Sequence, residues 1–131
     1  MIESNFENPM EGMQTREPIR LKRGQRTVLN HIYEGSTVSV FFHPQLRRGL
    51  VLLSKDPESI CGPKAVLRDN PDNIQGKELG IHDPVIFKEG QVVVVHHPKS
   101  EEVIKVRLID DKQSGDIYMQ LGFERQAVLK T

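Results

Sequence analysis

Basic residues gather in one part of this sequence, where they could hold phosphate groups. Between residues 16 and 55 there are eight lysines and arginines against two acidic residues, a local net charge of +6. The eight are Arg16, Arg20, Lys22, Arg23, Arg26, Arg47, Arg48 and Lys55. Guanidinium groups bind phosphate and the guanine edge through paired hydrogen bonds. The cluster therefore predicts a phosphate-binding patch; the alternative is a solvated face balanced by acidic residues elsewhere in the chain.

Sequence-specific RNA recognition also needs aromatic or guanidinium planes on which bases stack. Aromatic residues are scarce, with five Phe, two Tyr and no Trp. The candidates near the basic cluster are Tyr33, Phe41, Phe42 and His43.

The residues that could carry catalysis or bind a metal form no known pattern. The sequence has no Gly-x-Ser-x-Gly, no phosphate-binding glycine loop and no His-Glu-x-x-His. Its one cysteine, Cys61, excludes an internal disulfide and a cysteine-based zinc site. His31 and His97 are better interpreted as strand histidines than as metal ligands. We therefore expect no enzyme, no metal and no cofactor.

A second pattern of phosphate-binding residues lies at the start of the cluster. Arg16 and Arg20 match Arg-x-x-x-Arg and so resemble half of the cyclic-di-GMP signature of PilZ domains, which are small β-barrels. The other half, Asp/Asn-x-Ser-x-x-Gly, does not follow. A PilZ-like cyclic-dinucleotide site stays a minor alternative.

The elements that must position these residues are strands. Short β-branched runs alternate with Gly, Pro, Asn and Asp from residue 17 onward, which is typical of an all-β protein. We expect strands at 18–22, 26–31, 37–42, 50–54, 65–68, 84–87, 92–97, 103–109, 116–121 and 127–130. Residues 1–15 are acidic and lack an apolar period, so we expect a disordered arm. At 131 residues, with balanced charge and apolar runs of only strand length, the chain fits a cytoplasmic protein outside the membrane.

The chain also contains an internal repeat. When the sequence is shifted by 66 residues, positions 17–54 align with 83–120 without a gap, and eight of the 38 positions are identical. Chance would give about two or three identities. We therefore expect a first β repeat at 16–68, a linker at 69–82 and a second β repeat at 83–131. A unit of this size is marginally stable alone, so the two should share one core as a pseudo-dimer.

Both copies follow one order of apolar strands and glycine turns, at 87–95, 103–108, 115–117 and 121–123 in the second copy and at 19–25 and 62–69 in the first. In this order each repeat resembles the carbon storage regulator (CsrA/RsmA) family of bacterial RNA-binding proteins. The resemblance implies four- to five-stranded units that insert strands into each other, with each copy's last strand beside the other's first. It departs from the family at the first-strand arginine, which falls on Leu21 and Phe87.

The resemblance implies a post-transcriptional regulator that binds single-stranded RNA loops through a basic strand. Its RNA-binding residues would be Arg20, Lys22, Arg23, Arg68, Lys88 and Lys130. The competing interpretation is a β-barrel interaction or assembly module that binds a protein partner through an edge strand. The chain would act as a monomeric pseudo-dimer or as a homodimer.

Overall fold

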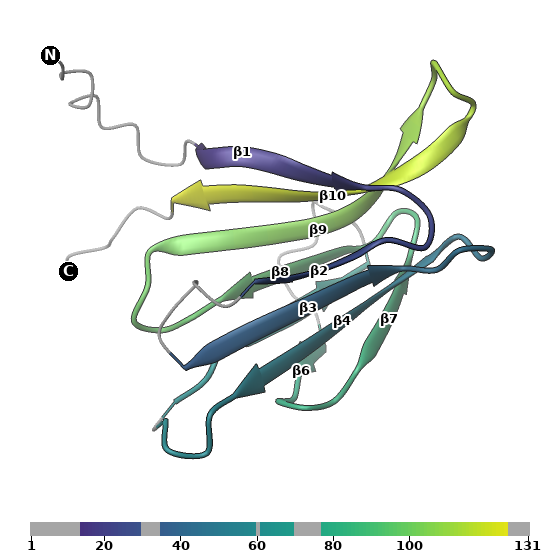
Figure 1. Cartoon of the computed structure of the whole chain (residues 1–131). Coiled ribbons are helices and arrows are strands. Elements are labelled where there is room, and N and C mark those ends of the chain that lie inside the picture. The colour runs from purple at the N-terminus through teal and green to yellow at the C-terminus, as the bar shows by residue number, and fades with distance from the viewer. Residues whose placement is uncertain (1–13, 30–34, 60, 70–76, 126–131) are drawn as a thin grey trace, which may run out of the picture.

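A computed structural model describes residues 14–29, 35–59, 61–69 and 77–125, which form ten strands and no helix (Figure 1). The strands are β1 (Gln14–Leu21), β2 (Arg26–Leu29), β3 (Ser36–Phe42), β4 (Arg48–Lys55), β5 (Lys64–Arg68), β6 (Lys77–Leu79), β7 (Val85–Lys88), β8 (Val92–His96), β9 (Glu102–Asp111) and β10 (Asp116–Arg125). The expected all-β class is confirmed. Within these residues no helix is long and apolar enough to cross a membrane.

The strands form two antiparallel sheets. The six-stranded sheet has the order β1-β10-β9-β8-β5-β6, and the four-stranded sheet has the order β2-β3-β4-β7. Both sheets contribute side chains to one apolar core, so the molecule is a sandwich with two outer faces. The outer faces are where functional side chains can be displayed.

Strand alternation decides which side chains enter the core. In β3, for example, Val38, Val40 and Phe42 are buried while the residues between them are only partly covered. In β9 the buried Val106 and Leu108 alternate with Lys105 and Arg107. Period-two patterns of this kind belong to strands with one buried face.

The two halves of the chain exchange their first strands. β1 pairs with β10, so it joins the sheet that holds β8, β9 and β10. Reciprocally, β7 pairs with β4 and joins the sheet that holds β2 and β3. The expected placement of a last strand beside the other half's first strand is wrong for β5, which pairs with β8 and β6. β5 and β7 belong to different sheets.

The turn after each first strand has the same hydrogen bonds in both halves. Gln25 donates its backbone N–H to the Lys22 carbonyl at 3.0 Å and accepts from the Lys22 N–H at 2.7 Å. Gln91 makes the same two bonds with Lys88, at 3.1 and 2.9 Å. Gly24 and Gly90 both have positive φ, 83° and 88°, which favours glycine at this position of the turn.

The ungapped alignment fails in the fourth strands. β2 with β3 and β8 with β9 keep the shift of 66 residues, since Thr27 pairs with Val40 and Val93 with Val106. In the fourth strands, however, Val51 of β4 pairs with Val85, and Leu121 of β10 pairs with Ile19. Ile19 and Val85 are 66 positions apart, whereas Val51 and Leu121 are 70 positions apart. The β9–β10 hairpin is longer than the β3–β4 hairpin, and Gly49 and Gly115 are therefore not in equivalent places.

Strand β6 lies inside the segment predicted to be a linker. Its three residues extend the six-stranded sheet by pairing with β5. Residues 56–59, after β4, form a simple turn in which the Ser59 N–H donates to the Asp56 carbonyl at 3.0 Å. The expected disordered arm at 1–15 is wrong for residues 14 and 15, which begin β1 and pair with β10. Residues 1–13, the expected strand at 127–130 and the end of the expected strand at 26–31 lie outside the described residues.

Candidate nucleic-acid interface

One lateral row of residues crosses the outer face of the six-stranded sheet and carries three arginines. We call it the basic row. In register from β1 to β5 it consists of Arg20, Gln120, Arg107, Val92 and Arg68. The arginines stand on every second strand, so their backbones are about 10 Å apart given a strand spacing of roughly 4.8 Å. A polyanion lying across the strands would meet all three in turn.

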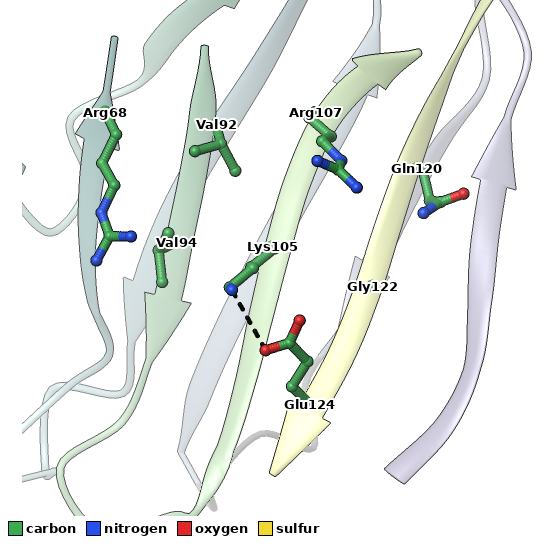
Figure 2. A pocket seen from close by; sticks show the side chains of 8 residues that line it. All are labelled: Arg68, Val92, Val94, Lys105, Arg107, Gln120, Gly122 and Glu124. Carbon is green, nitrogen blue, oxygen red and sulfur yellow. Dashed lines mark ion pairs between the residues drawn. The ribbon is translucent and has the colours of Figure 1, made fainter. Parts of the chain in front are cut away.

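A shallow hollow of about 160 Å³ lies beside the basic row (Figure 2). Its lining consists of Arg68, Val92, Val94, Lys105, Arg107, Gln120, Gly122 and Glu124. Val94, Lys105 and Gly122 lie side by side in the next row of the sheet, and Gly122 adds no side chain to the surface. Cavities of roughly 150 Å³ hold one benzene ring, so the hollow has the size of one ring or one phosphate group.

The cations around the hollow are only partly neutralised. Lys105 pairs with Glu124, with Nζ and Oε1 3.3 Å apart, and both side chains are about two-fifths exposed. Arg107 is exposed and forms no ion pair or side-chain hydrogen bond with the residues that the structure describes. The side chain of Arg68 extends to the level of Val94 (Figure 2), and its buried Nε has no hydrogen-bond partner there. The guanidinium groups of Arg107 and Arg68 can therefore bind an anionic ligand.

Arg20 lies at the opposite end of the row and is supported by an aromatic ring. Its guanidinium carbon stands 4.8 Å from the centre of the Tyr118 ring. Tyr118 is on β10, two residues before Gln120 and on the same face of the sheet. A flat guanidinium stacked on a ring holds one orientation, which suits it for paired contacts with phosphate or for stacking on a base.

Arg23, a predicted RNA-binding residue, is engaged within the protein. Its Nε and Nη2 each donate to the Asp116 carboxylate at 2.9 Å, and Nη1 donates to the Leu46 carbonyl at 3.1 Å. This pairing lowers the pKa of Asp116 to about 2, with a further contribution from the Ile117 N–H. Arg23 therefore joins the β1–β2 turn to the β9–β10 hairpin.

The other predicted residues are spread over the molecule. Lys22 is exposed in the turn after β1, next to the Arg20 end of the basic row. Lys88 lies at the end of β7 in the other sheet, paired across the strands with Arg48. Lys130 is outside the described residues. The structure thus brings Arg20 and Arg68 into one row and places Lys88 away from it.

The remaining members of the basic cluster do not form one patch. Arg47 donates to the Glu89 carboxylate at 2.7 and 3.0 Å, which lowers the pKa of Glu89. Arg26 and Arg48 are exposed on the outer face of the four-stranded sheet. The predicted single patch is wrong in this respect, because folding divides its members between two sheets and pairs two of them with distant carboxylates.

The aromatic residues expected to stack on bases are also elsewhere. Phe42 is fully buried in the core, and Phe41 lies on the outer face of the four-stranded sheet. The His43 ring is held in the β3–β4 turn, where its Nδ1 accepts from the N–H groups of Gln45 and Leu46, both at 2.9 Å. Tyr33 is outside the described residues. Tyr118 is the aromatic residue beside the basic row.

Sequence reasoning missed Lys105, Arg107, Gln120 and Tyr118. The signal was present, because Lys105 and Arg107 alternate with buried apolar residues and so had to share the outer face of one strand. The net charge of −2 over residues 71–131 concealed these cations among ten acidic residues.

The histidine expected on a strand, His97, is fully buried beyond the end of β8. Its Nε2 lies 3.3 Å from the Cys61 carbonyl, and its Nδ1 accepts from the Lys99 N–H at 3.0 Å. No group of three potential metal ligands occurs among the residues that the structure covers. His31 is not among them.

Comparisons with known proteins give no guide to this chain: neither family models, nor curated proteins, nor solved structures yield a match.

Proposed function

We propose that this protein is a non-enzymatic, cytoplasmic RNA-binding regulator that holds single-stranded RNA across the outer face of its six-stranded sheet. The observation that carries the proposal is the basic row, in which Arg20, Arg107 and Arg68 lie in register across five strands. Phosphate contacts supply most of the affinity of such proteins. Binding at this face would mask a message from ribosomes or nucleases.

The side chains between the cations allow more than charge attraction. Gln120 offers an amide donor and acceptor, Glu124 offers an acceptor, and the floor of the hollow is made by Val92, Val94 and Gly122. A base that leaves its stack could lie on this floor while its edge meets the polar groups. Recognition of unstacked bases in loops is the usual route to RNA sequence specificity.

The exchange of strands supports the tandem-repeat part of the proposal. β1 and β7 each complete the sheet of the other half. The turns at 22–25 and 88–91, which we call the two Lys-x-Gly-Gln turns, each make the same internal hydrogen bonds. Reciprocal strand insertion is what the resemblance to carbon storage regulators implies. We infer that the chain is a pseudo-dimer made from two fused copies of one β unit.

A gel-shift titration tests the function. The full chain is titrated with a short hairpin RNA that carries GGA in its loop, the element suggested by the resemblance, and with a scrambled-loop hairpin, at two salt concentrations. We expect loop-dependent binding below about micromolar, and a loss of about ten-fold or more in Arg107→Ala and Arg68→Ala. Arg26→Ala, which removes an exposed arginine from the other sheet, is the matched control and should bind like the wild type.

Two outcomes would overturn the proposal. One is equal, weak binding of both hairpins that disappears at the higher salt, which is nonspecific charge attraction. The other is an equal loss in Arg26→Ala and Arg107→Ala, which would show that total charge matters and the basic row does not.

A further inference from the structure

The outer face of the four-stranded sheet carries an apolar patch, unlike the face that carries the basic row. Val28, Phe41, Leu50, Leu52 and Ile86 point outward there, in two adjacent rows across β2, β3, β4 and β7 that also contain Arg26 and Ser39. Val28 is 54% exposed and Ile86 is 63% exposed. We call these five residues the apolar face.

Strand β4 shows that this face suits contact with protein. Leu50, Val51, Leu52 and Leu53 form a continuous apolar run. Val51 and Leu53 are buried in the core, while Leu50 and Leu52 point to the outer face. Continuous runs of this kind belong to strands that are buried on both faces, whereas a strand with one solvated face alternates with polar residues.

Charged residues lie at opposite ends of the apolar face. At one end Arg48 and Lys88 point outward and are exposed, and the exposed Arg26 lies in the next row, on β2. At the other end the chain leaves β4 through the exposed Asp56 and Glu58. Lys55 stands at this second end as well, but its Nζ donates to the Ser59 carbonyl of its own loop at 3.1 Å. The face is therefore basic at one end and acidic at the other.

We propose that the apolar face binds a second copy of this chain. A two-fold dimer whose axis runs across the strands places the basic end of one copy over the acidic end of the other, and this charge complementarity favours it over the dimer whose axis runs along the strands. Two sheets packed face to face at about 10 Å would bury the five apolar side chains of both copies. If the proposed RNA function also holds, the dimer presents two basic rows that face away from each other, because each row lies on the far side of its sandwich.

Sedimentation equilibrium of the full chain tests this proposal without reference to RNA. The wild type should be dimeric at about 100 μM, which requires a dissociation constant of roughly 10 μM or less. Ile86→Asp should raise that constant at least about 100-fold, because symmetry places two carboxylates in an apolar contact. Leu46→Asp changes an equally exposed leucine (55%) outside the apolar face and should leave the dimer intact. Cooperative thermal unfolding of each variant verifies that it is folded.

A charge exchange tests the orientation of the dimer. Arg48→Glu with Lys88→Glu, and separately Asp56→Lys with Glu58→Lys, should each weaken the dimer about ten-fold, and the four changes together should restore it. A wild-type chain that stays monomeric up to about 100 μM, or an Ile86→Asp chain that dimerises like the wild type, overturns the proposal. Failure of the four changes to restore the dimer overturns the antiparallel arrangement.

Discussion

Two equivalent rows of the sandwich carry opposite chemistry. On the six-stranded sheet the row that starts at β1 and crosses β10, β9 and β8 consists of Arg20, Gln120, Arg107 and Val92. On the four-stranded sheet the row at the same register is Ile86, Leu50, Phe41 and Arg26. The inner sides of the same strands are alike, with Leu21 facing the core on β1 and Phe87 on β7. Both inner faces pack into one core, which favours apolar side chains on both sheets, whereas nothing in the fold constrains the outer faces to match.

A second comparison shows how the two halves are held together. In each half the turn after the first strand is bound to the hairpin between the third and fourth strands of the other half. Arg23 binds Asp116 in one case, and Glu89 binds Arg47 in the other. The two contacts join equivalent elements with reversed charges. The turn supplies the cation in the Arg23–Asp116 pair, and the hairpin supplies it in the Arg47–Glu89 pair.

The strongest test of the difference between the faces is charge reversal on each. Arg107→Glu should weaken binding of the GGA hairpin about 100-fold, because it removes a phosphate contact and adds repulsion at the centre of the basic row. Arg26→Glu makes the same change in net charge on the other sheet and should cost less than about three-fold. Titration of both variants at one salt concentration measures the contrast. Similar losses in both would contradict a binding face on one sheet only.

An exchange at equivalent positions sharpens the comparison. Arg20→Ile gives β1 the residue that β7 has, and should lower RNA affinity about ten-fold through the loss of one charged contact. Ile86→Arg, the reverse change, should leave RNA affinity within about two-fold, because Ile86 lies on the outer face of the other sheet, away from the basic row. The salt dependence of binding should become shallower only in Arg20→Ile, which the same titrations will show.

The two Lys-x-Gly-Gln turns are predicted to be equally sensitive to alanine. Gly24→Ala and Gly90→Ala each place a Cβ on a residue with positive φ and should each lower the free energy of unfolding by about 1 kcal/mol. At Gly90 the added Cβ meets no atom within 4 Å, so its cost comes from the backbone alone. Urea denaturation measures both. A cost confined to one turn would contradict their equivalence.

The smallest expected effect is the pH dependence of the two ion pairs between the halves. Pairing lowers the pKa of Asp116 from 3.8 to about 2 and that of Glu89 below 4.5. A lowered carboxyl pKa adds stability above the unfolded value, and this stability is lost as the pH falls through the folded value. In Arg23→Ala the pKa of Asp116, followed by NMR, should rise toward 3.8 while the remaining Ile117 N–H bond keeps it below that value, and stability should fall less between pH 5 and 2. An unchanged Asp116 titration would contradict the pairing.

The strands were largely predictable because their signal is local. Short β-branched runs bounded by turn residues located nine of the ten described strands, such as β8 and β9, within a few residues of their ends. The three residues of β6 carry no such alternation, and their strand conformation depends on the hydrogen bonds that β5 offers. The candidate site was predictable only in part: Arg20 and Arg68 were identified, while Arg107 was missed because the net charge of its half of the chain is negative, although its alternation with buried apolar residues was visible.

By itself the sequence determined the all-β class, the inward and outward faces of most strands, and the two Lys-x-Gly-Gln turns. Each depends on residues within a few positions of one another. Only the tertiary structure decided that β1 and β7 exchange sheets, that Arg20, Arg107 and Arg68 share one row, and that Arg23 is bound to a carboxylate 93 residues away. Which strands pair and which charges are neutralised depends on which segments meet in space. The alternation of inward and outward residues along one strand does not specify its partner strand.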